Sequence, residues 1–241
     1  MKNTLLGIVV VCICFSCEYL PRELTNEEVI NGLRQALTIG SENAANLASE
    51  KDKGFWQNEL IHIPLPPEAE MVKSVLNGTA LAQATLTLLG FNQQLIDFEK
   101  SLNNAAEIAA KGAFEIFANA VKGMTIADGF AILRGDDDAA TQYLRLHTTE
   151  PLTNAFMPIV ASAIAEVKII TDFWNPIIGT YNTVNALPFV NLGEPVNPNL
   201  DEYVTGKAID GLMKLIEIEE LKIRTDPLAR VTPLLRRVFG Q

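Results

Sequence analysis

Residues 201–224 read DEYVTGKAIDGLMKLIEIEELKIR and form the clearest amphipathic pattern in the chain. Its apolar residues recur three, four or seven positions apart, a spacing that brings side chains onto one face of an α-helix. These residues are Ala208, Leu212, Leu215, Ile216 and Ile223. A helix of this kind buries its apolar face against neighbouring elements. The stretch therefore predicts a long helix with one side in the protein core.

The same helical spacing returns along most of the chain, and no segment alternates at the two-residue period of a strand for long. We therefore expect an all-α protein, a single compact domain of about eight to ten helices. The other expected helices cover 25–48 with Gly40 as a break, 67–89, 92–122 with a break at 111–112, 125–134, 136–147, 148–170 with a kink at Pro158, 171–186, and 226–240.

Several expected helices have recognisable starts. Thr25-Asn26-Glu27-Glu28 has the composition of a capping box, with Thr at the N-cap and Glu three residues later. Asp136-Asp137-Asp138 is expected to cap the helix that follows it, and Asp226-Pro227 offers an N-cap followed by proline at the first helical position. These signals predict where helices begin more firmly than where they end.

The first seventeen residues have the composition of a secretory leader. Lys2 is followed by the apolar stretch 5–15, which is too short to cross a bilayer, and then by Ser16-Cys17. A small residue before a cysteine at this point resembles a bacterial lipoprotein box. We expect residues 1–16 to be a signal peptide, 17–24 a tether lipidated at Cys17, and 25–241 the helical domain. An ordinary signal peptide, an anchor helix or lipidation at Cys14 are the alternatives.

Composition excludes several classes of site. Every cysteine lies in the leader, so the domain has no disulfide, no cysteine-ligated zinc and no thiol nucleophile. The formal charge is −10, and an acidic chain repels nucleic acid, so no nucleic-acid partner is expected. His62 and His147 lack a second histidine at ligand spacing, and 136–138 lacks the rest of a calcium loop. No metal and no cofactor is therefore predicted.

Charged residues crowd the C-terminal third. Glu220 and Arg224 are four apart and Lys207 and Asp210 three apart, so each pair can meet on one helix face. A solvated surface and a partly buried carboxylate–guanidinium cluster that lines a groove both fit this spacing.

From about Leu33 to Gly240 the chain resembles the bacterial domain-of-unknown-function family 4197. The matching stretches include 63–66, 103–107, 116–120, 124–128, 135–143, 187–190, 203–205, 207–212, 219–220, 223–230 and 234–240. Gly112 and Pro233 depart from the family pattern and affect only local helix ends. Members often carry an export or lipoprotein leader, which agrees with Cys17.

The resemblance implies no activity, but it singles out polar positions as a candidate binding cluster. The cluster consists of Glu107, Asp136, Thr141, Tyr143, Lys207, Asp210, Glu219, Glu220, Arg224 and Arg230. These residues either form a buried network that fixes helix register, which must be fully hydrogen-bonded, or line a site.

The expected function is that of a membrane-tethered helical module in the bacterial cell envelope, with its domain facing the periplasm or exterior. It would bind a lipid, a peptide or an envelope protein without catalysing a reaction. The alternatives are a hydrolase that uses carboxylates such as Glu107 or Glu219 as general acid or base, and a purely structural envelope protein.

Overall fold

A computed structural model describes residues 23–67, 91–165 and 199–239, with ten further positions between them (69, 167, 174, 178, 179, 182, 183 and 186–188). The leader with Cys17 lies outside these residues, as do most of the helices expected over 67–89 and 171–186. The described chain is helical and contains no strand, which confirms the all-α prediction.

Seven α-helices and one 3-10 helix make up the described part, fewer α-helices than the eight to ten expected for the whole chain. They are α1 (Asn26–Ala48), α4 (Phe91–Ala110), α5 (Ala113–Gly123), α6 (Ile126–Arg134), α7 (Ala139–Ala165), α9 (Leu200–Thr225), η2 (Pro227–Ala229) and α10 (Pro233–Phe239).

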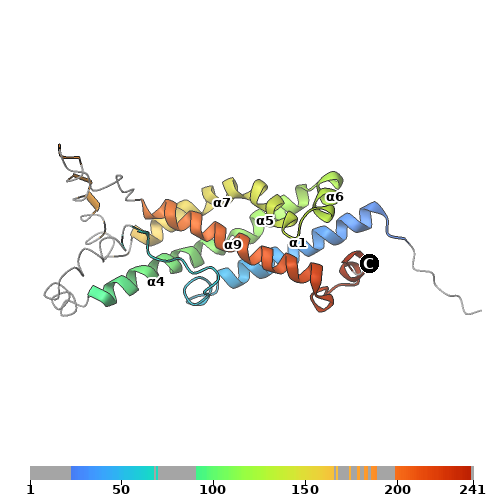
Figure 1. The fold of residues 1–241 in the computed structure, drawn as a ribbon, viewed down its shortest axis with the longest axis horizontal. Coiled ribbons are helices and arrows are strands. Elements are labelled where there is room, and N and C mark those ends of the chain that lie inside the picture. Colours follow the sequence, from blue (N-terminus) through green and yellow to red (C-terminus); the bar gives the residue numbers. More distant parts are fainter. Residues whose placement is uncertain are drawn as a thin grey trace, which may run out of the picture.

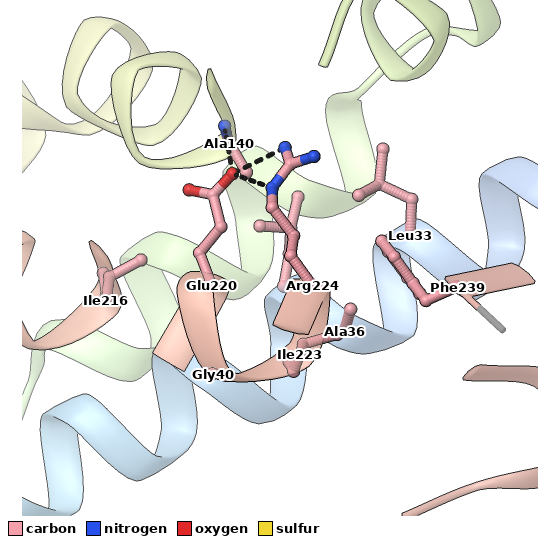
Figure 2. Close-up of a pocket in the computed structure, with 10 residues that line it drawn as sticks. Leu33, Ala36, Gly40, Ala140, Ile216, Glu220, Ile223, Arg224 and Phe239 are labelled. Atoms are coloured by element: carbon pink, nitrogen blue, oxygen red, sulfur yellow. Dashed lines mark hydrogen bonds and ion pairs between the residues drawn. The ribbon is translucent and has the colours of Figure 1, made fainter. Parts of the chain in front are cut away.

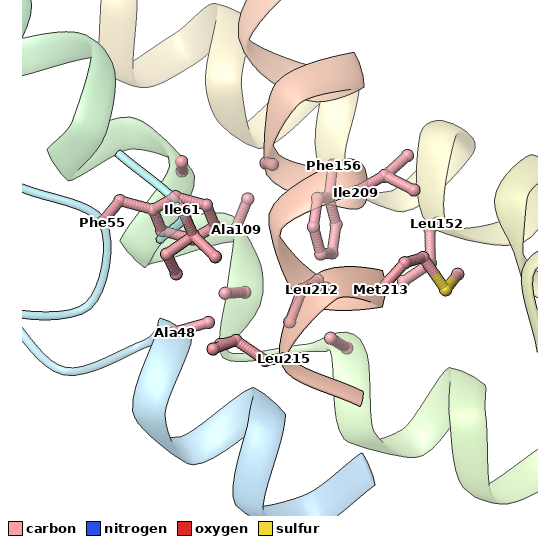
Figure 3. Close-up of a cluster of buried hydrophobic side chains, with 14 of the residues drawn as sticks. Ala48, Phe55, Ile61, Ala109, Leu152, Phe156, Ile209, Leu212, Met213 and Leu215 are labelled. Carbon is pink, nitrogen blue, oxygen red and sulfur yellow. The ribbon is translucent and has the colours of Figure 1, made fainter. Parts of the chain in front are cut away.

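The long helices α1, α4, α7 and α9 run along the long axis of the molecule (Figure 1). Helix α9 packs against α7, α1 and α4, so the amphipathic stretch quoted above lies at the centre of the fold. Leu212 and Met213 of α9 are fully buried and face Leu152 and Phe156 of α7 in one continuous apolar core (Figure 3). Burial of apolar area on three sides of α9 is the main driving force for this arrangement.

The start expected at Thr25 is confirmed. Thr25 accepts a hydrogen bond from the Glu28 N–H, and the Glu28 carboxylate accepts one from the Thr25 N–H, which is the predicted capping box. Thr125 and Asp128 form a second box at α6. The hydroxyl and backbone N–H of Thr125 lower the pKa of the Asp128 carboxyl by donating to it.

The break expected at Gly112 is present between α4 and α5, whereas the break considered at Gly40 is absent. Helix α1 continues through Gly40, where a Cβ would lie 3.4 Å from the Cβ of Glu219. The glycine therefore allows α1 and α9 to approach closely instead of ending a helix.

Two predicted helix boundaries were wrong. Helix α7 does not end at His147 but continues through Pro151 and Pro158 to Ala165. Its buried residues recur every four positions across the expected restart, so packing holds the helix together where proline removes backbone donors. These residues are Leu144, Thr148, Leu152, Phe156, Val160 and Ile164.

The single last helix expected over 226–240 is instead η2 followed by α10. Asp226 caps as expected, accepting the Leu228 N–H at 2.9 Å. Pro233 then begins a new helix, because proline is favourable at a helix start and disruptive further inside.

Gly211 and Gly206 of α9 differ in how closely neighbouring residues pack against them. A Cβ at Gly211 would lie 2.8 Å from Cε1 of Phe55 and 3.1 Å from Cβ of Ile61, whereas at Gly206 it would meet no described heavy atom within 4 Å. We expect Gly211→Ala to lower the free energy of unfolding by about 1–3 kcal/mol through overpacking. Gly206→Ala should raise it by up to about 1 kcal/mol through helix propensity. Urea unfolding of both variants measures the difference, and equal shifts would contradict the close packing.

Candidate functional site

Two groups of polar residues in the described chain are built around a buried carboxylate, Glu220 on α9 and Glu107 on α4. The first, which we call the Glu220 cluster, consists of Glu220 and Arg224 of α9 with Thr141 of α7. The second, the α4 stripe, consists of Glu99, Asn103 and Glu107, each four residues from the next. Side chains four apart share one face of a helix, so each group can reach a single neighbouring segment.

Glu220 lies at the contact between α9 and the first turn of α7 and is only 8% exposed. One carboxylate oxygen accepts the Ala140 N–H at 3.0 Å, and the other accepts the Thr141 N–H at 2.9 Å and the Thr141 hydroxyl at 2.8 Å. Arg224 completes the arrangement, with Nε at 3.0 Å and Nη2 at 2.8 Å from the first oxygen (Figure 2). Five hydrogen bonds thus converge on one carboxylate.

The first N–H groups of a helix have no partner within the helix and carry partial positive charge, so a carboxylate there is stabilised twice. The predicted role of 136–138 as the cap of α7 is only partly right. Asp138 does precede the helix, and its carbonyl accepts the Gln142 N–H. The carboxylate that binds the N–H groups of Ala140 and Thr141, however, belongs to Glu220, eighty residues away in sequence.

Two arginines also donate hydrogen bonds to backbone carbonyls. Nη2 of Arg224 donates to the Ile132 carbonyl of α6 at 3.2 Å. Arg230 donates to the carbonyls of Ile223 and Arg224 at 3.0 and 2.8 Å, and these carbonyls belong to the last turn of α9. Because carbonyls at a helix end lack partners, Arg230 acts as a C-terminal cap of α9.

A small cavity lies beside the Glu220 cluster, and its walls are almost entirely apolar (Figure 2). Leu33 and Leu37 of α1, Ile223 of α9 and Phe239 of α10 contribute to it. Its volume open to the centre of a water molecule is about 20 Å³. That is room for about one water molecule, since one needs roughly 10–15 Å³ by this measure. A substrate-sized ligand does not fit there without movement of α10.

Glu107 performs the corresponding role on α4, where it is 2% exposed. One oxygen accepts the Asp52 N–H at 2.8 Å, and the other accepts the N–H groups of Phe55 and Trp56 at 3.0 and 3.2 Å. Lys100 also bonds the Asp52 carboxylate at 2.9 Å, and this ion pair lowers the pKa of Asp52. Segment 51–56, which has no regular structure, is thereby fixed against α4.

The other two members of the α4 stripe hold the next part of the same segment. Asn103 accepts the Ile63 N–H at 2.9 Å and donates to the Ile63 carbonyl at 2.8 Å. His62 has its Nε2 3.0 Å from Glu99 and its Nδ1 3.1 Å from the Trp56 carbonyl. Sequence reasoning had not placed Asn103 or Glu99 in the cluster. The repeat of polar residues at 99, 103 and 107 was the signal that could have found them.

The remaining predicted residues do not join either group. Tyr143 lies on α7, with its hydroxyl 3.4 Å from the Ala120 carbonyl, and burial raises its pKa. Asp136 is exposed ahead of α7, and Glu219 bonds Asn43 and Lys222 at 2.9 and 2.7 Å.

The pair expected between Lys207 and Asp210 is replaced by two other contacts. Asp210 bonds Arg145 of α7 at 2.8 Å, and the Lys207 ammonium lies 5.9 Å from the centre of the Tyr203 ring. Asp210 thus pairs with an arginine of α7 and not with Lys207 of its own helix.

Comparison with known families covers almost the whole described fold. The family model described as protein of unknown function (DUF4197) matches residues 23–240. The chain belongs to the DUF4197 family. No match was found among curated proteins or among solved structures. The matched range begins three residues before α1.

The DUF4197 domain has a second, larger cavity at the other end of α9. Its volume is about 370 Å³, and Tyr203, Leu200, Pro66, Pro67 and Trp174 contribute to its walls. Tyr203 is positioned there by its hydroxyl, which donates to the Pro64 carbonyl at 3.0 Å. Asn199 and Glu202 also line the cavity, so its walls are partly polar, and its size is within the range of small-ligand sites.

Within the described residues no group of histidine, cysteine, aspartate or glutamate could hold a metal ion. None of the described helices is long and apolar enough to cross a bilayer alone. Helices α5 and α6 reach that length only as a pair, with a bend of 104° between them.

Removing the Glu220 carboxylate should destabilise the domain strongly. Glu220→Ala leaves the Arg224 guanidinium and two N–H groups of α7 without their acceptor, and breaking a buried ion pair costs about 3–5 kcal/mol. Glu217→Ala is the matched control, because Glu217 lies on the same helix in an exposed pair with Lys214. That change should cost no more than about 1 kcal/mol. Chemical unfolding measures both, and similar losses would contradict the structural role of the cluster.

Proposed function

We propose that this DUF4197 protein is a lipid-anchored module of the bacterial cell envelope, whose helical body binds a lipid, a peptide or a partner protein and carries out no catalysis. The observation that carries the proposal is the apolar stretch that ends at Ser16-Cys17, with five residues between Cys17 and Glu23, where the family match begins. Two or three acyl chains on Cys17 would hold the body on a membrane, at about 0.8 kcal/mol per buried methylene.

The geometry of the polar cluster favours binding over catalysis. A general acid or base must come within hydrogen-bond distance of its substrate. Glu107 is 2% exposed and accepts three backbone N–H groups, and Glu220 accepts five hydrogen bonds from within the protein. We therefore assign Glu107, Thr141, Glu220, Arg224 and Arg230 to the scaffold, and place binding in the cavity beside Tyr203.

Lipidation at Cys17 is tested by Cys17→Ser in the full chain. The variant should lose incorporated fatty acid and leave the membrane fraction, because the sulfur that would carry the diacylglycerol is gone. Cys14→Ser is the control and should keep both the label and the membrane location. Metabolic labelling with a palmitate analogue, followed by fractionation, measures the two effects. A Cys17→Ser protein that keeps its fatty acid and stays in the membrane would contradict the anchor.

Binding beside Tyr203 is tested by native mass spectrometry of the mature protein purified from its own membranes. We expect an added mass that is lost in Tyr203→Ala, which removes the aromatic wall of the cavity and its bond to Pro64. Tyr143→Ala is the control, since Tyr143 does not line that cavity, and it should retain the added mass. A ligand-free mass for the unaltered protein would contradict the binding proposal.

A further inference from the structure

The strongest unexplained surface feature lies after α9, where apolar side chains project into solvent. Leu228 of η2 is 88% exposed and Val231 is 58% exposed, whereas Leu235 of α10, a few residues later, is fully buried. Pro227 and Pro233 restrict the backbone on either side. Two large apolar groups held outward by a proline-restricted turn suit contact with an apolar surface better than contact with water.

The position of this turn relative to the start of the fold is fixed by α10. A Cβ at Gly32 of α1 would lie 2.6 Å from Cγ2 of Val238, so α10 packs directly on the first half of α1. Arg237 lies 3.7 Å from Glu28 in the first turn of α1, and the Thr232 hydroxyl donates to Gln35 at 2.7 Å. Helix α10 therefore lies along the first half of α1, and the turn with Leu228 and Val231 lies beside the middle of that helix.

The length of the preceding chain limits how far this part can lie from a membrane. Only five residues, 18–22, lie between Cys17 and Glu23. The six steps from Cys17 to Glu23 span at most about 20 Å at roughly 3.5 Å per residue. An anchor at Cys17 would therefore keep the start of α1 close to the lipid headgroups, and with it α10, which packs on the first half of α1.

The charges of this region are compatible with that position. Residues 227–239 contain three arginines and no acidic residue, in a chain whose formal charge is −10. Arg236 is exposed. Arg237 faces Glu28, and Arg230 donates its hydrogen bonds to carbonyls of α9. Asp226 bonds the Leu228 N–H. An acidic body is repelled by anionic lipid, so the arginine-bearing side is the one that can approach it.

We propose that the turn carrying Leu228 and Val231, together with Arg236 of α10, is a membrane-docking surface that inserts its two apolar side chains shallowly into the bilayer to which Cys17 is anchored. The inference rests on the lipid anchor proposed above and adds an orientation to it. Shallow insertion of apolar side chains beside arginines that reach the headgroups is the usual arrangement of interfacial segments. The occupant is the lipid surface itself.

The lipidated mature protein permits a clean test, because its only cysteine would be the blocked Cys17. Leu228→Cys then provides a single free thiol for an environment-sensitive fluorophore. Leu146→Cys is the matched control, an 80% exposed leucine on α7, which packs against α9, α4 and α5. Each labelled protein is placed in vesicles of phosphatidylethanolamine and phosphatidylglycerol, with and without a lipid-attached nitroxide quencher.

We expect the probe at position 228 to shift its emission to shorter wavelength and to be quenched by the nitroxide lipid, while the probe at 146 does neither. Arg236→Glu should reduce the shift at 228. A vesicle-bound protein whose 228 probe behaves like the 146 probe overturns the docking surface and leaves the anchor intact. A blue shift without lipid quenching, dependent on protein density, assigns the turn to a second copy and also overturns it. A Cys17 that itself reacts with the fluorophore shows that the anchor has failed.

Discussion

The carboxylate of Glu220 is the constraint on which the arrangement of the two longest helices depends. It joins the C-terminal part of α9 to the first turn of α7 and at the same time neutralises Arg224, which reaches on to α6. Apolar faces alone allow helices to slide or rotate past one another at little cost. A buried charge that must find its donors permits only one register, because any shift leaves it unpaired in a medium of low dielectric constant.

Glu107 and Asn103 in the same way fix a segment that has no regular backbone hydrogen bonds of its own. Residues 51–65 bury Phe55, Ile61 and Ile63 between α4 and α9 without forming helix or strand. Their backbone groups still require partners, since an unpaired buried N–H costs about as much as a lost hydrogen bond. The side chains of α4 supply those partners. Polar residues within the helices thus do the work that regular secondary structure does elsewhere.

The class of fold was accessible from the sequence because helical periodicity and capping residues are local signals. The capping box at Thr25, the helix start at Thr125 and the long helix expected over 201–224 follow directly from them. The continuity of α7 through two prolines was not accessible, because it depends on core contacts made by residues on both sides of them. The contact between Glu220 and Arg224 can be read from their spacing of four residues on one helix. The contact between Glu220 and Ala140 was missed for a related reason, because the two residues are eighty apart in sequence.

The packing of α10 on α1 has a consequence for the order in which the chain can fold. Gly32 of α1 is covered by Leu234 and Val238 of α10, which lie about two hundred residues further along the chain. Contacts between residues so far apart in sequence form late and slow folding. If the chain crosses a membrane before it folds, as the proposed lipid anchor requires, α1 has no complete partner surface until residues 234–238 have followed it across.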